Sequence, residues 1–289
     1  MIPASFEYFR PSSLGEAITL LTQHGDEAKI LSGGQSLIPM MKFRLSRPRV
    51  LIDINRIPNL EYIREEDGFL KIGGLTREAE LERSELIRSK YPLLHDTSFV
   101  VADVQVRSLA TVGGNLAHGD PANDHPATML ALDAEIVATG PQGERVIPIE
   151  EFFISIFTTA LQPDEILTEI RVPANGGHSG GAYLKVERKV GDYATAAVAV
   201  QIALNGNGAV ERAGIGMTNV GPTPLKAKSA EAFVQEKPLN QENINEAARL
   251  ASEEAQPSSD LRGPAEYKTA LVRELTRRAL HRAAERAEK

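Results

Sequence analysis

The sequence predicts an α+β protein in which 289 residues form three successive units. Helix and strand patterns alternate at the start of the chain, hairpin turns interrupt its middle, and a glycine-rich linker precedes antiparallel strands and two helices. These three observations place the units at residues 1–57, 58–174 and 178–289. The last unit is expected to be an antiparallel sheet with a helical bundle.

The first unit is predicted to alternate helix and strand. Ser13 and Glu16 have the spacing of a capping box, apolar residues follow at helical spacing, and Gly25 is suited to end the helix. Buried strands are expected at residues 28–31 and 50–54, and a short helix is expected at 39–43. A glycine-containing loop would then follow the end of the first strand, as in α/β units.

The middle unit is predicted to mix hairpins with helices. Asp67-Gly68 is a hairpin turn signal, and Gly140-Pro141-Gln142-Gly143 separates two further strand patterns at residues 134–139 and 144–147. A last strand is expected at 166–172. Helical patterns occupy residues 77–83, 86–98 and 127–132.

The third unit follows the linker at residues 173–181, which is rich in glycine. Strands are expected at 182–188, 196–204 and 210–217, with an Asn-Gly turn between the last two. The tail from Gln241 onward is predicted to be two helices, one ending before Pro257 and one starting at Pro264.

Composition excludes several classes of function. A net charge of -7 argues against a nucleic-acid partner, because phosphate binding needs a basic face. The chain has no cysteine, so it can hold neither an iron–sulfur cluster nor a disulfide. Its six histidines lack the spacing of a zinc motif, and no metal site is expected. No apolar run is long enough for a membrane span, and no secretory signal is recognisable, so a cytoplasmic protein is expected.

Two glycine doublets are the strongest functional signal. Each removes two adjacent Cβ atoms and is followed by small polar residues, which suits loops whose amides close on a phosphate. Either doublet alone could simply mark a turn, and neither has the order of a dinucleotide or P-loop motif. Together they could clamp one diphosphate. The candidate residues are Ser32, Gly33, Gly34, Gln35, Ser36, Leu37, Thr111, Val112, Gly113, Gly114 and Asn115.

Two further clusters could bind the rest of such a ligand. Asp124 could accept hydrogen bonds from a ribose or base edge, although it and its polar neighbours Asp120 and Asn123 could equally be turn and cap residues. A metal site or acid–base pair is the other alternative for the two aspartates, but no partner ligands are present. Lys185 and Tyr193 could place a cation and an aromatic face beside a flat ligand, or Tyr193 could be a half-buried core residue.

Four motifs in fixed order resemble the FAD-binding medium subunits of molybdenum hydroxylases, the xanthine dehydrogenase family. They are SGGQSLIPMMKFRL, TVGGNLAHGDPANDHPA, KVERKVGDYATAA and DLRGPAEYK. Within that family the likeness is greatest to the branch of aerobic carbon monoxide dehydrogenases. The resemblance implies a PCMH-type, non-Rossmann FAD-binding fold in two subdomains, with a third unit covering the flavin.

The resemblance also implies roles for individual residues. Residues 32–36 and 111–115 would bind the FAD pyrophosphate, and Asp124 would meet the ribose or adenine. Leu167 would approach the cofactor through its backbone, Lys185 would lie near the flavin, and Tyr193 would lie against the isoalloxazine. No residue of this chain is expected to act as a catalytic acid, base or metal ligand.

The implied partners are a large molybdenum-cofactor subunit and a small subunit with [2Fe-2S] clusters, assembled as a dimer of heterotrimers. This chain would take electrons from the clusters and pass them to an external acceptor, in a cytoplasmic complex able to associate with the inner face of the membrane. The alternatives are the flavin subunit of an aldehyde, purine or N-heterocycle dehydrogenase, a stand-alone flavin oxidase, and a non-redox nucleotide-binding module.

Overall fold

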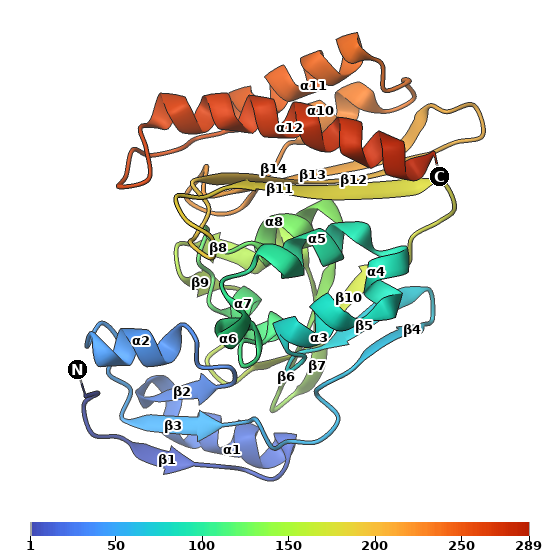
Figure 1. The fold of residues 1–289 in the computed structure, drawn as a ribbon. Helices are drawn as coiled ribbons and strands as arrows, with labels where there is room; N and C mark the ends of the chain where they lie inside the picture. The colour runs from blue at the N-terminus through green and yellow to red at the C-terminus, as the bar shows by residue number, and fades with distance from the viewer. Residues whose placement is uncertain (1, 289) are drawn as a thin grey trace.

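The computed structural model describes residues 2–288 and contains three main sheets, one above another (Figure 1). A three-stranded sheet lies near the N-terminus, a five-stranded sheet lies in the middle, and a four-stranded sheet lies beneath the C-terminal helices. This mixture of helices and antiparallel and parallel strands confirms the predicted α+β class. Within residues 2–288, no helix combines the length and apolar character needed to cross a bilayer.

The first sheet is parallel, in the order β1-β3-β2, and α1 packs against β2 and β3. Ser13 caps α1 by accepting from the Glu16 amide at 3.2 Å, while the Glu16 carboxylate accepts from the Ser12 amide at 2.8 Å. The predicted capping box therefore exists with its return bond displaced by one residue. The elements are β1 (Glu7–Phe9), α1 (Leu14–His24), β2 (Ala28–Leu31), α2 (Leu37–Lys42) and β3 (Val50–Asp53).

The middle sheet is antiparallel, in the order β4-β5-β10-β6-β7. Both predicted hairpins and the last predicted strand are present. The strands are β4 (Ile63–Glu66), β5 (Phe69–Gly73), β6 (Glu135–Gly140), β7 (Gly143–Pro148) and β10 (Ile166–Pro173), with a small hairpin formed by β8 (Phe153–Ser155) and β9 (Thr158–Thr159).

The helices of the middle unit differ from expectation at one point. The single helix predicted at 86–98 is two helices, because Pro92 cannot donate a backbone hydrogen bond and instead opens a new helix after Tyr91. The helices are α3 (Glu78–Arg83), α4 (Glu85–Lys90), α5 (Pro92–Val100), α6 (Val104–Arg107), α7 (Val112–Ala117), α8 (His125–Ala131) and α9 (Ile149–Phe152).

The third sheet is antiparallel, in the order β11-β12-β13-β14, and its helices cover the face away from the middle unit (Figure 1). Helix α10 was not predicted, because its seven residues are too few to show a clear apolar period. The elements are β11 (Ser179–Val186), β12 (Ala196–Leu204), β13 (Val210–Thr218), β14 (Leu225–Lys226), α10 (Lys228–Val234), α11 (Gln241–Glu254) and α12 (Ala265–Ala287).

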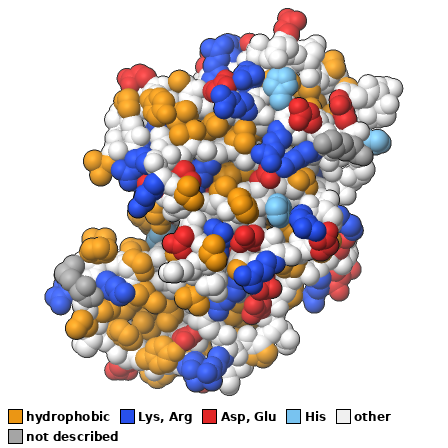
Figure 2. Space-filling model, viewed as in Figure 1, with side chains coloured by type: hydrophobic (Ala, Val, Ile, Leu, Met, Phe, Trp, Pro, Cys, Tyr) orange, Lys and Arg blue, Asp and Glu red, His pale blue; other side chains and the backbone are white. Residues whose placement is uncertain are grey.

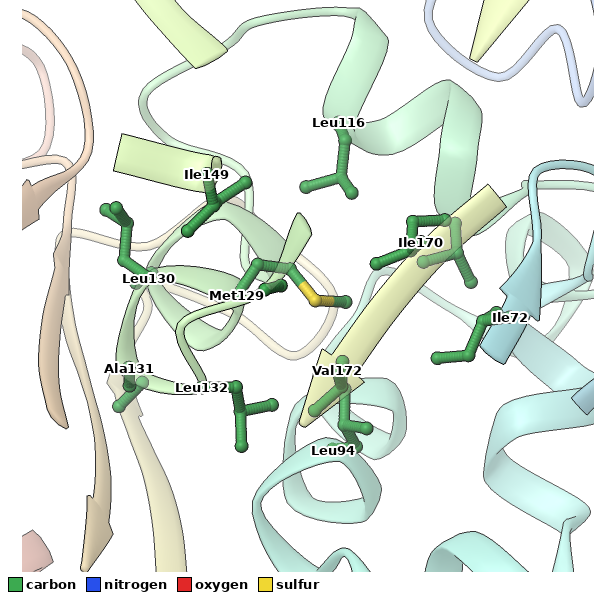
Figure 3. Packing of buried hydrophobic residues seen from close by; sticks show 14 of the residues in the cluster. Ile72, Leu94, Leu116, Met129, Leu130, Ala131, Leu132, Ile149, Ile170 and Val172 are labelled. Carbon is green, nitrogen blue, oxygen red and sulfur yellow. The ribbon is translucent and has the colours of Figure 1, made fainter. Parts of the chain in front are cut away.

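The largest apolar core fills the middle unit. Figure 3 shows Ile72 of β5 and Ile170 of β10 facing Leu116 of α7 and Met129 of α8. All four side chains are fully buried. The same cluster includes Tyr183, Ala197 and Ala199 of the third sheet, so the middle unit and the third sheet share one core.

Helix α8 lies directly on strand β13 because two glycines remove the side chains between them. A Cβ at Gly214 would overlap the carbonyl oxygen of Ala131, and a Cβ at Gly216 would overlap that of Ala127. The alternate residues Gly214 and Gly216 share one face of the strand, and the oxygens that they meet are one helical turn apart. This glycine seam fixes the third sheet against the helix that follows Asp124.

The glycine seam predicts that Gly216→Val lowers the free energy of unfolding by about 3 kcal/mol, the upper end for overpacking. Gly206→Ala is the control, because Gly206 lies in a turn where an added Cβ meets nothing within 4 Å. Its effect should stay within about 0.5 kcal/mol. Urea denaturation of the full chain measures both, and equal effects of the two substitutions would contradict a close-packed seam.

Candidate functional site

The structure brings the two glycine segments into direct contact. The hydroxyls of Ser32 and Thr111 lie 3.1 Å apart, although 79 positions separate them in sequence. A Cβ at Gly33 would lie 2.5 Å from the carbonyl oxygen of Leu109 and 2.7 Å from the Cα of Ala110. Only glycine allows the two backbones to approach this closely.

The first segment is a loop between β2 and α2 with unused backbone donors. The amides of residues 33–36 donate to no protein acceptor among the described residues. Gly34 has a φ of 72°, in the left-handed region that favours glycine, and this reverses the chain before α2. Successive free amides in such a turn form a concave site for an anion.

The second segment is not the loop that the sequence predicted but the start of helix α7. Thr111 is the N-cap, and its hydroxyl accepts from the Gly114 amide at 3.1 Å. The Gly113 amide donates to the Gly74 carbonyl at 3.2 Å, and a Cβ at Gly113 would lie 2.5 Å from that oxygen. A strong N-cap residue outweighed the low helix propensity of two glycines.

The two glycine segments consequently offer a ligand different groups. Val112 and Asn115 also donate their amides to protein carbonyls, at 3.0 Å and 2.9 Å, so the second segment offers a ligand its side chains and the space left by Gly114. A Cβ on Gly114 would lie 2.7 Å from the Thr111 hydroxyl and 2.8 Å from that of Ser32. The first segment alone combines a glycine doublet with free amides.

Asn55 and Arg77 hold the junction in place, and the sequence gave no signal for either residue. The Asn55 amide donates to the Ser32 carbonyl at 2.8 Å. The Arg77 guanidinium donates to the Asn55 side-chain oxygen at 2.7 Å and also to the Leu109 carbonyl. One guanidinium therefore links the supports of both glycine segments.

A cavity of about 760 Å³ opens at this junction. Its size lies within the range of about 300–1,000 Å³ that is usual for ligand and cofactor pockets. Most of the candidate residues line it, whereas Val112, Gly113, Leu167 and Lys185 do not. The candidates that line it are Ser32, Gly33, Gly34, Gln35, Ser36, Leu37, Thr111, Gly114, Asn115, Asp124 and Tyr193.

Leu167 and Lys185 lie behind the cavity wall. A Cβ on Gly74 would overlap the carbonyl of Leu167, so the Leu167 backbone packs directly on Gly74. The Gly74 carbonyl in turn accepts a hydrogen bond from the Gly113 amide. The Lys185 ammonium donates to the Asp124 carboxylate at 3.0 Å and to the Val100 carbonyl at 3.2 Å. Both residues contact groups that position the wall.

Asp124 is held by two side chains of β11. One carboxylate oxygen accepts from the Tyr183 hydroxyl at 2.6 Å, and the other accepts from Lys185. Burial raises the pKa of the Asp124 carboxyl, and Lys185 and Tyr183 oppose that rise. Asp124 does not cap α8 with its side chain, so the cap role considered from the sequence is wrong. Each carboxylate oxygen keeps a further lone pair for a ligand at the cavity surface.

Tyr193 lies at the rim of the cavity with 41% of its surface exposed, so it is not a core residue. The Arg262 guanidinium lies 5.6 Å from the ring centroid and donates to Asp192 at 3.1 Å. Asp192 also accepts from the Tyr193 amide at 2.8 Å. Arg262 thereby fixes the turn that carries the tyrosine.

Other lining residues had weak or no sequence signal. Asn123 and His118 come from the polar run before α8, and the His118 ring packs on Phe157 with centroids 5.1 Å apart. Phe157 and Glu165 lie in connecting segments without a motif, so only the fold could place them at the cavity. Figure 2 shows the hollow between the lower and upper parts of the molecule, bordered by hydrophobic and charged side chains.

The donor set fits an elongated ligand with a central diphosphate. Free amides on residues 33–36 suit the phosphates, and a side chain at Gly114 would fill the space beside them. The Asn115 side-chain oxygen is buried without a partner, which marks an acceptor that a ligand hydroxyl or amine could satisfy. Tyr193 supplies an aromatic surface at the cavity rim.

The chain belongs to the family described as the FAD binding domain in molybdopterin dehydrogenase, whose model matches residues 4–175. Residues 181–283 match the CO dehydrogenase flavoprotein C-terminal domain. The family resemblance inferred from the four sequence motifs is confirmed.

Within this family the chain is similar to carbon monoxide dehydrogenase medium chains. It is 45% identical to that of Hydrogenophaga pseudoflava, with 98% of each chain covered. The solved structure of reconstituted CO dehydrogenase from Oligotropha carboxidovorans has a TM-score of 0.96 at 44% identity, covering 99% of this chain and 100% of that one. A 6-hydroxypseudooxynicotine dehydrogenase complex subunit from Paenarthrobacter nicotinovorans is 39% identical, covering 99% of this chain and 97% of that relative.

The geometry at Thr111 predicts that Thr111→Val speeds amide hydrogen exchange at Gly114 about fivefold. The substitution removes both the helix cap and the hydroxyl that faces Ser32, and a cap is worth about 1 kcal/mol. Thr19→Val on α1 is the control, since its hydroxyl bonds only the Gly15 carbonyl. Unchanged exchange at Gly114 in the Thr111 variant would contradict the capping role.

Proposed function

We propose that this chain is the FAD-binding electron-transfer subunit of a molybdenum hydroxylase complex of the carbon monoxide dehydrogenase type. One observation carries the proposal: residues 33–36, whose amides are free, line a cavity next to the packed start of α7. This arrangement supplies phosphate-binding donors without a cationic clamp, which suits a chain with a net charge of -7. Family membership identifies the ligand class as FAD.

When bound, FAD supplies the electron-transfer chemistry, and the protein supplies its position and surroundings. The amides of residues 33–36 would hold the diphosphate, and the hydroxyls of Ser32 and Thr111 would border it. Asp124 and the unpartnered oxygen of Asn115 are the acceptors for the ribose or adenine. Tyr193, whose ring lies beside Arg262, would contact the isoalloxazine.

Leu167 and Lys185 have supporting roles in this proposal. The Leu167 carbonyl packs on Gly74 and so maintains the contact with Gly113. Lys185 acts on the cofactor through Asp124, because its ammonium is bonded to that carboxylate. Each of the three units in the division 1–57, 58–174 and 178–289 then contributes one part of the cavity wall.

The partners in the proposed complex are a large subunit with the molybdenum cofactor and a small subunit with [2Fe-2S] clusters. Since this chain has no cysteine for a cluster, the electrons must enter from a partner. They leave to an external acceptor. The assembly is a dimer of heterotrimers in the cytoplasm, able to associate with the inner face of the membrane.

Flavin content tests the proposal directly. The purified full chain, incubated with FAD and then desalted, should be yellow and contain about one FAD per chain. A non-redox nucleotide module would remain colourless. The co-purified complex, supplied in turn with carbon monoxide, an aldehyde and an N-heterocycle, should show flavin bleaching with its own substrate. Bleaching by carbon monoxide supports the stated type, and bleaching by another substrate alone identifies a related dehydrogenase.

Gly114→Val should abolish stoichiometric FAD binding. Its side chain would clash with the hydroxyls of Thr111 and Ser32, because even a Cβ is within 2.8 Å of both. Gly15→Ala on α1, where an added Cβ meets nothing within 4 Å, is the control and should keep its flavin. Absorbance after desalting and a thermal melt distinguish loss of flavin from loss of fold.

Tyr193→Ala should change the flavin spectrum and its reoxidation rate while leaving FAD bound. The substitution removes a rim contact and leaves the amides of residues 33–36 untouched. FAD affinity should fall less than about tenfold, equivalent to roughly 1.4 kcal/mol. Complete flavin loss would show that the ring contact and the phosphate contacts are not separate.

A further inference from the structure

We propose that FAD binding to this chain is coupled to the uptake of a proton at a buried Glu78–His125 pair behind the cavity wall. The inference rests on the proposed function, and it assigns His125 as a positioning residue. The His125 Nε2 lies 2.6 Å from a Glu78 carboxylate oxygen, and both side chains are fully buried. Neither residue lines the cavity.

The pair is tied to both ends of the second glycine segment. The Glu78 amide donates to the Ala110 carbonyl at 3.0 Å, immediately before Thr111. On the other side, the Asn123 side-chain amide donates to the Asn115 carbonyl at 2.8 Å, two residues before His125. The separation between Glu78 and His125 is therefore linked to the position of residues 111–115.

The pair also belongs to a larger array of buried charge. Glu78 from α3 and the adjacent Asp124 face His125, while Tyr183 and Lys185 from β11 hydrogen-bond to Asp124, and Glu187 follows directly after β11. Lys185 lies 3.3 Å from the Glu187 carboxylate. The array thus contains three carboxylates and one lysine, and a protonated His125 supplies the second positive charge. Loss of its proton leaves an additional uncompensated negative charge in a buried environment.

The electrostatic setting favours the protonated ring. Burial lowers the pKa of His125, but the Glu78 and Asp124 carboxylates outweigh that effect and the pKa lies above its ordinary value. Because the pKa of His125 is raised in the folded chain, its protonated ring stabilises the fold fully at low pH. This stabilisation is lost as the pH rises through that folded-state pKa. The negative charge of a diphosphate in the adjacent cavity would raise the pKa of His125 further. FAD binding would therefore be accompanied by proton uptake at His125.

Two atoms of the pair have no hydrogen-bond partner within residues 2–288, namely the Nδ1 of His125 and the second carboxylate oxygen of Glu78. If the pair served only to fill the core, two apolar side chains would stabilise the fold as well or better. The retained polar atoms are consistent with a group that changes its protonation state rather than one that only packs.

Calorimetry of FAD binding measures the coupling. The FAD-depleted full chain is titrated with FAD at about pH 7.5, in buffers with different ionisation enthalpies, and the slope of heat against that enthalpy gives the protons taken up. The wild-type chain should take up a fraction of one proton, and the FAD Kd should rise with pH by no more than about tenfold per unit.

Variants identify the group that takes up the proton. His125→Gln should abolish the uptake, whereas His281→Gln on α12 should retain the wild-type value. Glu78→Gln removes the neighbouring carboxylate, so the pH of maximal uptake should move lower. This second variant keeps the test informative if His125→Gln does not fold.

The outcomes separate this inference from the proposed function. FAD binding without proton uptake, or uptake that survives in His125→Gln, overturns the coupling and leaves the flavin assignment intact. Uptake lost in His118→Gln but kept in His125→Gln also overturns it, because His118 lines the cavity. Failure of the wild-type chain to bind FAD overturns both. Histidine NMR should show the ring pKa above its free value in the holo chain and lower in Glu78→Gln.

Discussion

The close approach of two backbones, at Gly33 and at Leu109–Thr111, is the contact on which the site depends. Without a side chain at Gly33, the loop after β2 lies against the start of α7, and the Ser32 and Thr111 hydroxyls meet at 3.1 Å. The amides of the first segment are then left facing the cavity. Arg77 and Asn55 maintain this contact through hydrogen bonds to the Ser32 and Leu109 carbonyls.

The rest of the cavity depends on a second close contact, the glycine seam between α8 and β13. This seam places β11, with Tyr183 and Lys185, within hydrogen-bonding distance of Asp124. The loop with the free amides and the turn that carries Tyr193 therefore come from different units, and shared packing holds these units together. Buried charge along α3, α8 and β11 links the same elements electrostatically.

Most helices and strands were predictable because a cap, a turn or an apolar period within a few adjacent residues marks them. The capping box at Ser13, the turn at Asp67-Gly68 and the apolar strand at 196–204 all lie where they were expected. Short elements such as β1 and α10 were missed, since tertiary pairing stabilises them more than their own sequence does. The glycine doublet at 113–114 was misjudged because the cap from Thr111 decided its conformation.

The candidate site was predictable only where a motif marked it. Asp124 and Tyr193 belong to such motifs, and both line the cavity. Asn55, Arg77 and Phe157 carry no local signal, because their importance comes from partners distant in sequence. Motifs also could not distinguish a wall residue from one behind it, as Lys185 and Leu167 show.

The glycine seam also sets the register of β13 on α8. With carbonyl oxygens of α8 seated on Gly214 and Gly216, a shift of the strand by one residue would drive the Ile215 side chain into the helix backbone. The register of the third sheet on α8 is thus determined by main-chain contacts rather than by the fit of side chains.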